Sequence, residues 1–168
     1  MIPSTATEWV VGNGQYNEVN RTHLRLRSMI RLKQIVIGDN CFGKVRVVEL
    51  DGLIELESVV IGQKSFMISD NERSDGSCQI VNCPNLKSLR IGGTSFQEYH
   101  SFELNNLPSL QSIDIGEYCF YYAPSFSLIG LIDWLVWIHR SSSITISQTW
   151  WCCIQSSSFG CVWEWLNG

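Results

Sequence analysis

The amino-acid sequence predicts a β-rich repeat solenoid, in which coils of about 24 residues stack so that their strands form parallel sheets. One observation behind this prediction is a recurring phrase, which reads IVIGDNCF at 35–42, VVIGQKSF at 59–66, LRIGGTSF at 89–96 and IDIGEYCF at 113–120. A second is that the apolar residues around the phrase recur with it. A third is the alternation of apolar and polar residues inside each coil, which is typical of strands.

The glycine of the phrase sets the period. A degraded copy, WVVGNGQY, occupies 9–16, and with it the glycine recurs at Gly12, Gly38, Gly62, Gly92 and Gly116. The aromatic residue that follows each glycine within the phrase recurs with the same gaps. The shortest gap occurs twice, so the basic unit is about 24 residues long, with two extra in one copy and six in another. A single coil of this length cannot bury its own apolar face, so a stack of matching coils is expected.

Seven apolar columns accompany the phrase. When four coils are aligned on the glycine, every coil has an apolar residue in every one of these columns. At an apolar content of 45%, this agreement has a chance probability of roughly 10⁻¹⁰ before the choice of register is allowed for. In the coil that ends at 120, the columns are Phe102, Leu104, Leu107, Leu110, Ile113, Ile115 and Phe120.

Each coil is predicted to contain two short strands, because Phe102-Glu-Leu104 and Ile113-Asp-Ile115 both alternate with a period of two. The apolar steps of three between them suit a tight turning segment, with room for at most a helical turn or two. We expect the glycine to permit a positive φ or a close turn, and the aromatic residue to anchor the corner. The predicted first strands lie near 24–26, 48–50, 78–80 and 102–104, and the second near 35–37, 59–61, 89–91 and 113–115.

The stretch LPSLQSIDIGEYCF at 107–120 and its sister stretches resemble leucine-rich repeats. The Gly-x-x-Cys/Ser-Phe corner resembles the BspA-like repeats of protists and bacteria. The resemblance covers about residues 9–131 and implies right-handed coils that bind other proteins through a sheet face or its loops. The asparagine ladder and the helical segment of ordinary leucine-rich repeats are missing, so a horseshoe is not implied.

The predicted organisation is a solenoid of about five coils over 1–138, with the first and last coils incomplete, and an atypical tail over 139–168. The register fails in the tail, which contains four tryptophans, seven serines and three cysteines. It is interpreted as a cap, as an apolar interaction segment, or as a mistaken reading frame or unspliced sequence, with the last slightly favoured. Both ends of the chain are interpreted as cuts through a longer array.

Charge narrows the possible partners. The net charge of −4 argues against a general nucleic-acid binder. Residues 1–46 hold seven Lys/Arg against three Asp/Glu, whereas residues 47–133 hold four against twelve. The early basic cluster indicates either an anionic partner or contact with a neighbouring acidic coil. Its members are Arg21, Arg25, Arg27, Arg31 and Lys33.

No signal peptide and no membrane-spanning segment are recognised, so a cytoplasmic location with reduced thiols is expected. The cysteines are interpreted as packing residues, because the Cys78-x₄-Cys83 pair has no partner pair at metal-ligand spacing. The histidines are isolated in the sequence. No catalytic residue, metal or cofactor is therefore predicted. The polar insertion after Phe66 is expected to be a plain loop.

The candidate binding residues occupy the outward positions of the predicted strands. Side chains alternate across a strand, so these positions form a row on the outer surface of each sheet, where solenoids commonly bind partners. The bland alternative is a solvated face. The first-strand row is Arg25, Glu49, Gln79, Glu103 and Ser127, and the second-strand row is Val36, Val60, Arg90 and Asp114, of which the last two are the candidates.

The favoured function is a non-catalytic module that binds a protein partner. One alternative is a parallel β-helix enzyme that acts on polysaccharide with carboxylates such as Glu49, Glu103 and Asp114. Another is a structural fragment whose function lies in missing domains.

Overall fold

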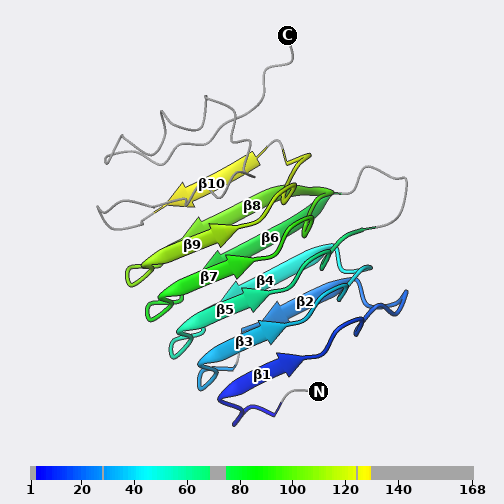
Figure 1. The fold of residues 1–168 in the computed structure, drawn as a ribbon. Coiled ribbons are helices and arrows are strands. Elements are labelled where there is room, and N and C mark those ends of the chain that lie inside the picture. Colours follow the sequence, from blue (N-terminus) through cyan, green and yellow to red (C-terminus); the bar gives the residue numbers. More distant parts are fainter. Residues whose placement is uncertain (1–2, 28, 69–74, 124, 130–168) are drawn as a thin grey trace.

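The computed structural model describes residues 3–27, 29–68, 75–123 and 125–129, and these contain ten strands and no helix. Figure 1 shows the strands stacked in two layers along one axis. The strands are β1 (Glu8–Val11), β2 (His23–Leu26), β3 (Gln34–Ile37), β4 (Val47–Asp51), β5 (Ser58–Ile61), β6 (Gly76–Val81), β7 (Ser88–Ile91), β8 (Tyr99–Asn105), β9 (Ser112–Ile115) and β10 (Ser125–Ile129).

The strands alternate between two parallel five-stranded sheets. The odd sheet has the order β1-β3-β5-β7-β9, and the even sheet has the order β2-β4-β6-β8-β10. In the odd sheet, Ile37 lies opposite Ile61, Ile61 opposite Ile91, and Ile91 opposite Ile115. The chain is therefore a β-solenoid of about five turns, as the repeat predicts. The predicted tail at 139–168 lies outside the described residues.

The interior consists of the predicted columns. All of the column residues are buried except Met29, Leu110 and Ile115, which are partly buried and pack against the same core. The apolar side chains at the edge of each coil are covered by those of the next coil. The core is thus continuous along the stack, as in other solenoids.

An aromatic ladder occupies one corner of the coils. The rings of Tyr16, Phe42, Phe66, Phe96 and Phe120 stack with centroids 4.6–5.1 Å apart and planes within 10° of parallel. This spacing matches the distance between neighbouring strands, so one ring per coil fills the corner. Aromatic pairs add about 0.5–1.5 kcal/mol beyond the burial of their area.

The corner glycines let the main chains of successive coils approach closely. A Cβ at Gly92 would lie 2.6 Å from the backbone nitrogen of Gln63, and one at Gly116 would lie 2.5 Å from that of Gly93. Of the two expected alternatives, the close turn is observed, since turn residues follow each of these glycines, whereas the positive φ is not, since only Gly14 and Gly52 among the described glycines have one. Space between coils, not backbone freedom, requires glycine here.

At this corner, positive φ angles fall two and four residues after each corner glycine, and the other positive φ angles, at Gly52, Asn82 and Asn106, directly follow β4, β6 and β8. In the third coil these residues are Lys64, with φ of 54°, and the ladder residue Phe66, with φ of 56°. Bulky residues seldom adopt this conformation outside tight turns, so stacking of the coils imposes the conformation. The remaining corners repeat it at Gly14 and Tyr16, Asn40 and Phe42, Thr94 and Phe96, and Tyr118 and Phe120.

The small-residue column beside the ladder forms hydrogen bonds between coils. The Ser65 hydroxyl donates to the carbonyl of Gly38 at 2.8 Å and accepts from the backbone N–H of Cys41 at 3.1 Å. Ser95 repeats both bonds one coil later, and the thiol of Cys119 donates to the carbonyl of Gly92 at 3.1 Å. The column therefore links the coils as well as packing between them.

The six-residue insertion is absorbed at the start of β6. The sheet register shifts between Gly76 and Ser77, and a Cβ at Gly76 would lie 3.1 Å from the ring of Tyr99. Tyr99 is fully buried, and its hydroxyl donates to the carbonyl of Val45 at 2.6 Å. Residues 69–74 of the expected loop lie outside the described residues.

Candidate binding faces

The first-strand row lies across the outer face of the even sheet. Arg25 pairs with Glu49 across β2 and β4, Glu49 with Gln79, and Gln79 with Glu103. Ser127 of β10 lies opposite Glu103 and completes the row. The structure therefore brings together all five residues that the alternation places there.

Two arginines enclose Glu49. The Arg25 Nε atom lies 3.3 Å from Glu49 Oε2, and the Arg27 guanidinium donates to Glu49 Oε1. This hydrogen bond, followed by the attraction of the Glu49 charge, raises the pKa of Arg27. Glu49 lies on the outer face, as the alternation predicts, but it is only 8% exposed. The long arginine side chains cover the carboxylate that they bind.

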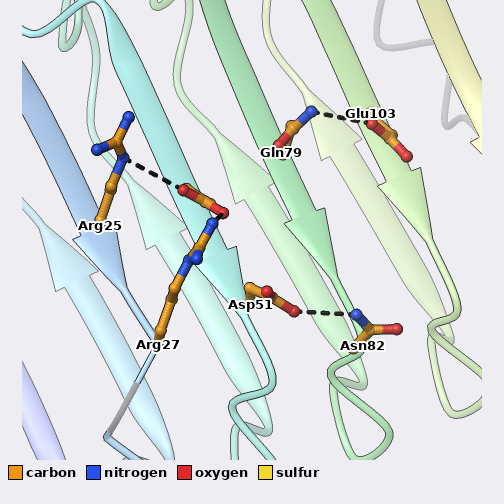
Figure 2. Close-up of polar contacts among 7 residues, drawn as sticks. Arg25, Arg27, Asp51, Gln79, Asn82 and Glu103 are labelled. Carbon is orange, nitrogen blue, oxygen red and sulfur yellow. Dashed lines mark hydrogen bonds and ion pairs between the residues drawn. The ribbon is translucent and has the colours of Figure 1, made fainter.

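The rest of the even face is also linked by side-chain hydrogen bonds (Figure 2). Gln79 Nε2 donates to Glu103 Oε2 at 3.1 Å, and Asn105 Nδ2 donates to Glu103 Oε1 at 3.2 Å. Asn82, which directly follows β6, donates through Nδ2 to Oδ1 of Asp51, the last residue of the neighbouring strand β4, at 2.9 Å. Both oxygens of each row carboxylate therefore have partners within the protein.

Sequence reasoning missed Arg27 and Asn105 as members of this network. Each lies two positions after a row residue on the same side of its strand, so the period of two could have identified both. The period could not reveal which carboxylate each side chain binds. Arg27 binds Glu49 of the neighbouring strand, and Asn105 binds Glu103 of its own strand.

The second-strand row lies on the outer face of the odd sheet and begins at Val10. Val10 lies opposite Val36, which lies opposite Val60, followed by Arg90 and Asp114. Val10 is 67% exposed, and Val36 and Val60 are partly exposed. Arg90 Nε lies 3.3 Å from Asp114 Oδ2, and both side chains are at least half exposed. This row is apolar over the first three strands and charged over the last two, and Glu8, Gln34 and Ser58 share the outer face with its valines.

The early basic cluster is exposed, and much of it contacts carboxylates of the protein. Besides the two arginines on Glu49, Lys33 Nζ lies 4.0 Å from Glu55 Oε2 in the next coil. Arg21 Nε lies 3.1 Å from Glu18 Oε2, and its guanidinium lies 4.7 Å from the centre of the Tyr16 ring. For Arg25, Arg27 and Lys33, contact with a neighbouring acidic coil is therefore observed.

The described cysteines are buried or partly buried, and the described histidines are exposed. Burial raises the pKa of the Cys78 thiol, and it raises that of Cys83 to about 11, which opposes the thiolate that a nucleophile or metal ligand requires. His23 and His100 are exposed on different strands, β2 and β8. Within the described residues, no three or more His, Cys, Asp or Glu side chains gather as a metal site would require. His139 lies outside the described residues.

No helix that is long and apolar enough to cross a membrane occurs in the part of the chain that the structure describes. Comparisons of the chain with models of protein families, with curated proteins and with solved structures gave no match.

Proposed function

We propose that this chain is a non-catalytic, leucine-rich-repeat-like module that binds a protein partner on an outer sheet face. The observation that carries the proposal is the register of the outer side chains, which places one outward residue from each strand in a row over five parallel strands. Such rows give a broad surface with no need for a pocket, which is how solenoids present binding residues.

The odd face is the better candidate for the contact. Its three valines offer an exposed apolar strip, and Arg90 and Asp114 border that strip with exposed charges. Protein interfaces commonly combine an apolar centre with a polar rim. On the even face, Glu49 and Glu103 already have partners on all their carboxylate oxygens, which favours a role of that row in stabilising the stack.

The carboxylates of the alternative polysaccharide enzyme are divided between the two sheets, and those of the even sheet are bound within the protein. Glu49 and Glu103 lie on β4 and β8 of the even sheet with β6 between them, and Asp114 lies on the odd sheet. A glycosidase needs two carboxyl groups that flank one bond. Glu49 is bound by two arginines and Glu103 by Gln79 and Asn105, and these bonds support the non-catalytic proposal.

Affinity capture with matched variants tests the proposal. Val60→Lys adds a charge to the odd face, and Gln79→Lys adds the same charge to the even face as a control. We expect the wild-type protein to capture a partner that Val60→Lys loses and Gln79→Lys keeps. In a titration with the purified partner, Val60→Lys should bind more weakly than Gln79→Lys. Equal retention of the partner by both variants would refute the proposal that the partner binds the odd face. Cleavage of a glycan from a panel, lost in Glu103→Gln, would refute the non-catalytic role.

A cytoplasmic location is part of this proposal. The four described cysteines are all free thiols, which suits a reducing compartment. The net charge of −4 supports a protein partner over a nucleic acid.

A further inference from the structure

Three exposed tyrosines gather at the corner that follows β9. Tyr118, Tyr121 and Tyr122 are 59%, 60% and 57% exposed, while Phe120 between them is buried in the aromatic ladder. The Tyr118 and Tyr121 ring centroids lie 5.9 Å apart, and those of Tyr121 and Tyr122 lie 4.8 Å apart in an edge-to-face arrangement. Single exposed apolar residues are ordinary, but a contiguous aromatic cluster marks an interaction site.

The stack itself does not require these aromatic rings. The same three positions of the preceding corner hold Thr94, Gln97 and Glu98, all of them polar. Ladder packing therefore accounts for Phe120 but not for the tyrosines around it. The tyrosine corner is nevertheless held by the stack, because the backbone N–H of Tyr122 donates to the carbonyl of Gln97 at 3.2 Å.

Two carboxylates lie near the tyrosines. Residues 91–129 contain four Asp or Glu residues and no Lys or Arg, but Asp114 pairs with Arg90 and Glu103 is bound on the even face, so the acidic residues of this corner are Glu98 and Glu117. Glu117 is exposed and directly precedes Tyr118, and Glu98 occupies the position beneath Tyr122 in the preceding coil. Aromatic faces attract Lys and Arg side chains, and nearby carboxylates supply the counter-charge. The chemistry of this corner thus complements a cationic ligand.

We propose that Tyr118, Tyr121 and Tyr122, together with Glu117, form a second docking surface, which binds a basic peptide segment of a partner protein. Arginine or lysine side chains of that segment lie against the rings, and their charges face the carboxylate. The surface is separate from the valine strip of the odd face, so the two proposals can fail independently.

Fluorescence anisotropy with a labelled peptide of alternating arginine and alanine tests the proposal on the full chain. A peptide of alternating glutamate and alanine serves as the charge control. We expect binding of the basic peptide alone, weaker at higher salt. Loss of one exposed cation–π contact corresponds to roughly a two- to fivefold weakening, so Tyr118→Ser, Tyr121→Ser and Tyr122→Ser combined should weaken binding by at least about tenfold.

Matched variants separate this surface from general attraction to an acidic protein. The combined Tyr→Phe variant should keep binding, since the rings remain, and Glu117→Gln should weaken it a few-fold. Val60→Lys should leave it within twofold. Unchanged binding by the triple serine variant, with wild-type circular dichroism, would overturn the proposal. The proposal would also be overturned if the wild-type protein self-associates, the triple serine variant does not, and the basic peptide fails to compete with the self-association.

Discussion

Replacement of Gly62 by alanine should destabilise the fold by about 3 kcal/mol. The added Cβ would lie 2.6 Å from the carbonyl carbon of Gly38 and 2.7 Å from the backbone nitrogen of Asp39, and it would also meet the Asp39 carboxylate. Carbon atoms in ordinary contact are about 3.5–4.0 Å apart, so the overlap is about 1 Å. Backbone atoms cannot rotate away from the new methyl group as a side chain could, so the coils must move apart. The expected cost therefore lies at the upper end of the range of about 1–3 kcal/mol for overpacked cores.

Gly52→Ala is the matched control. Gly52 has a φ of +67°, and a Cβ there would have no neighbour within 4 Å. The substitution therefore adds only the strain of a left-handed residue, about 1–2 kcal/mol. Urea unfolding followed by circular dichroism gives both free energies from the midpoint and slope. A cost for Gly62→Ala no greater than that for Gly52→Ala would refute the reasoning that the corner glycines are needed for space.

Three further predictions concern buried polar groups. Ser65→Ala removes a hydroxyl that makes two hydrogen bonds between coils and should cost about 2 kcal/mol in urea unfolding, whereas Ser65→Cys keeps a donor and should cost less. Tyr99→Phe should cost about 1–2 kcal/mol, because the Val45 carbonyl loses its buried partner; a cost near zero would contradict this. Burial raises the pKa of Cys83 and Cys119 from 9.0 to about 11, so the unfolded chain releases these protons first. The stability that the neutral thiols confer is therefore full below about pH 9 and falls as the pH rises toward 11. The urea midpoint in reductant should drop between pH 7 and pH 10, and Cys119→Ser should reduce the drop.

The stacked architecture could be predicted because similar residues recur at the same positions of every coil. An apolar side chain at the same position of every coil reports burial directly, and the recurring glycine fixes the register. The repeat therefore predicts Ile37 and Ile61 to be neighbours, and they lie opposite each other in the odd sheet. No long-range information beyond the repeat was needed.

The corner backbone could not be predicted in the same way. Glycine is favoured both by a positive φ and by lack of space, and the sequence does not distinguish these causes. The positive φ falls instead on residues as different as Lys64 and Phe66. Their own preferences do not determine it; the tight turn between stacked strands does.

The polar contacts on the faces were predicted only in part. Alternation placed Glu49 on the outer face correctly, but its burial depends on how Arg25 and Arg27 of the neighbouring coil lie over it. Side-chain conformations of this kind are not encoded in spacing. The tyrosines of the YCFYY stretch at 118–122 carried a visible signal, since aromatic residues replace polar ones at three positions of the repeat.

The parallel stacking of coils is tested most directly by NMR scalar couplings across hydrogen bonds. The amide nitrogens of Gly62, Gly92 and Gly116 lie 2.8, 2.7 and 2.8 Å from the carbonyl oxygens of Ile37, Ile61 and Ile91. Each glycine nitrogen should therefore couple to the carbonyl carbon of the residue that directly precedes the glycine of the previous coil. Coupling to a carbonyl within the same coil, or to one in a strand of opposite direction, would contradict the solenoid.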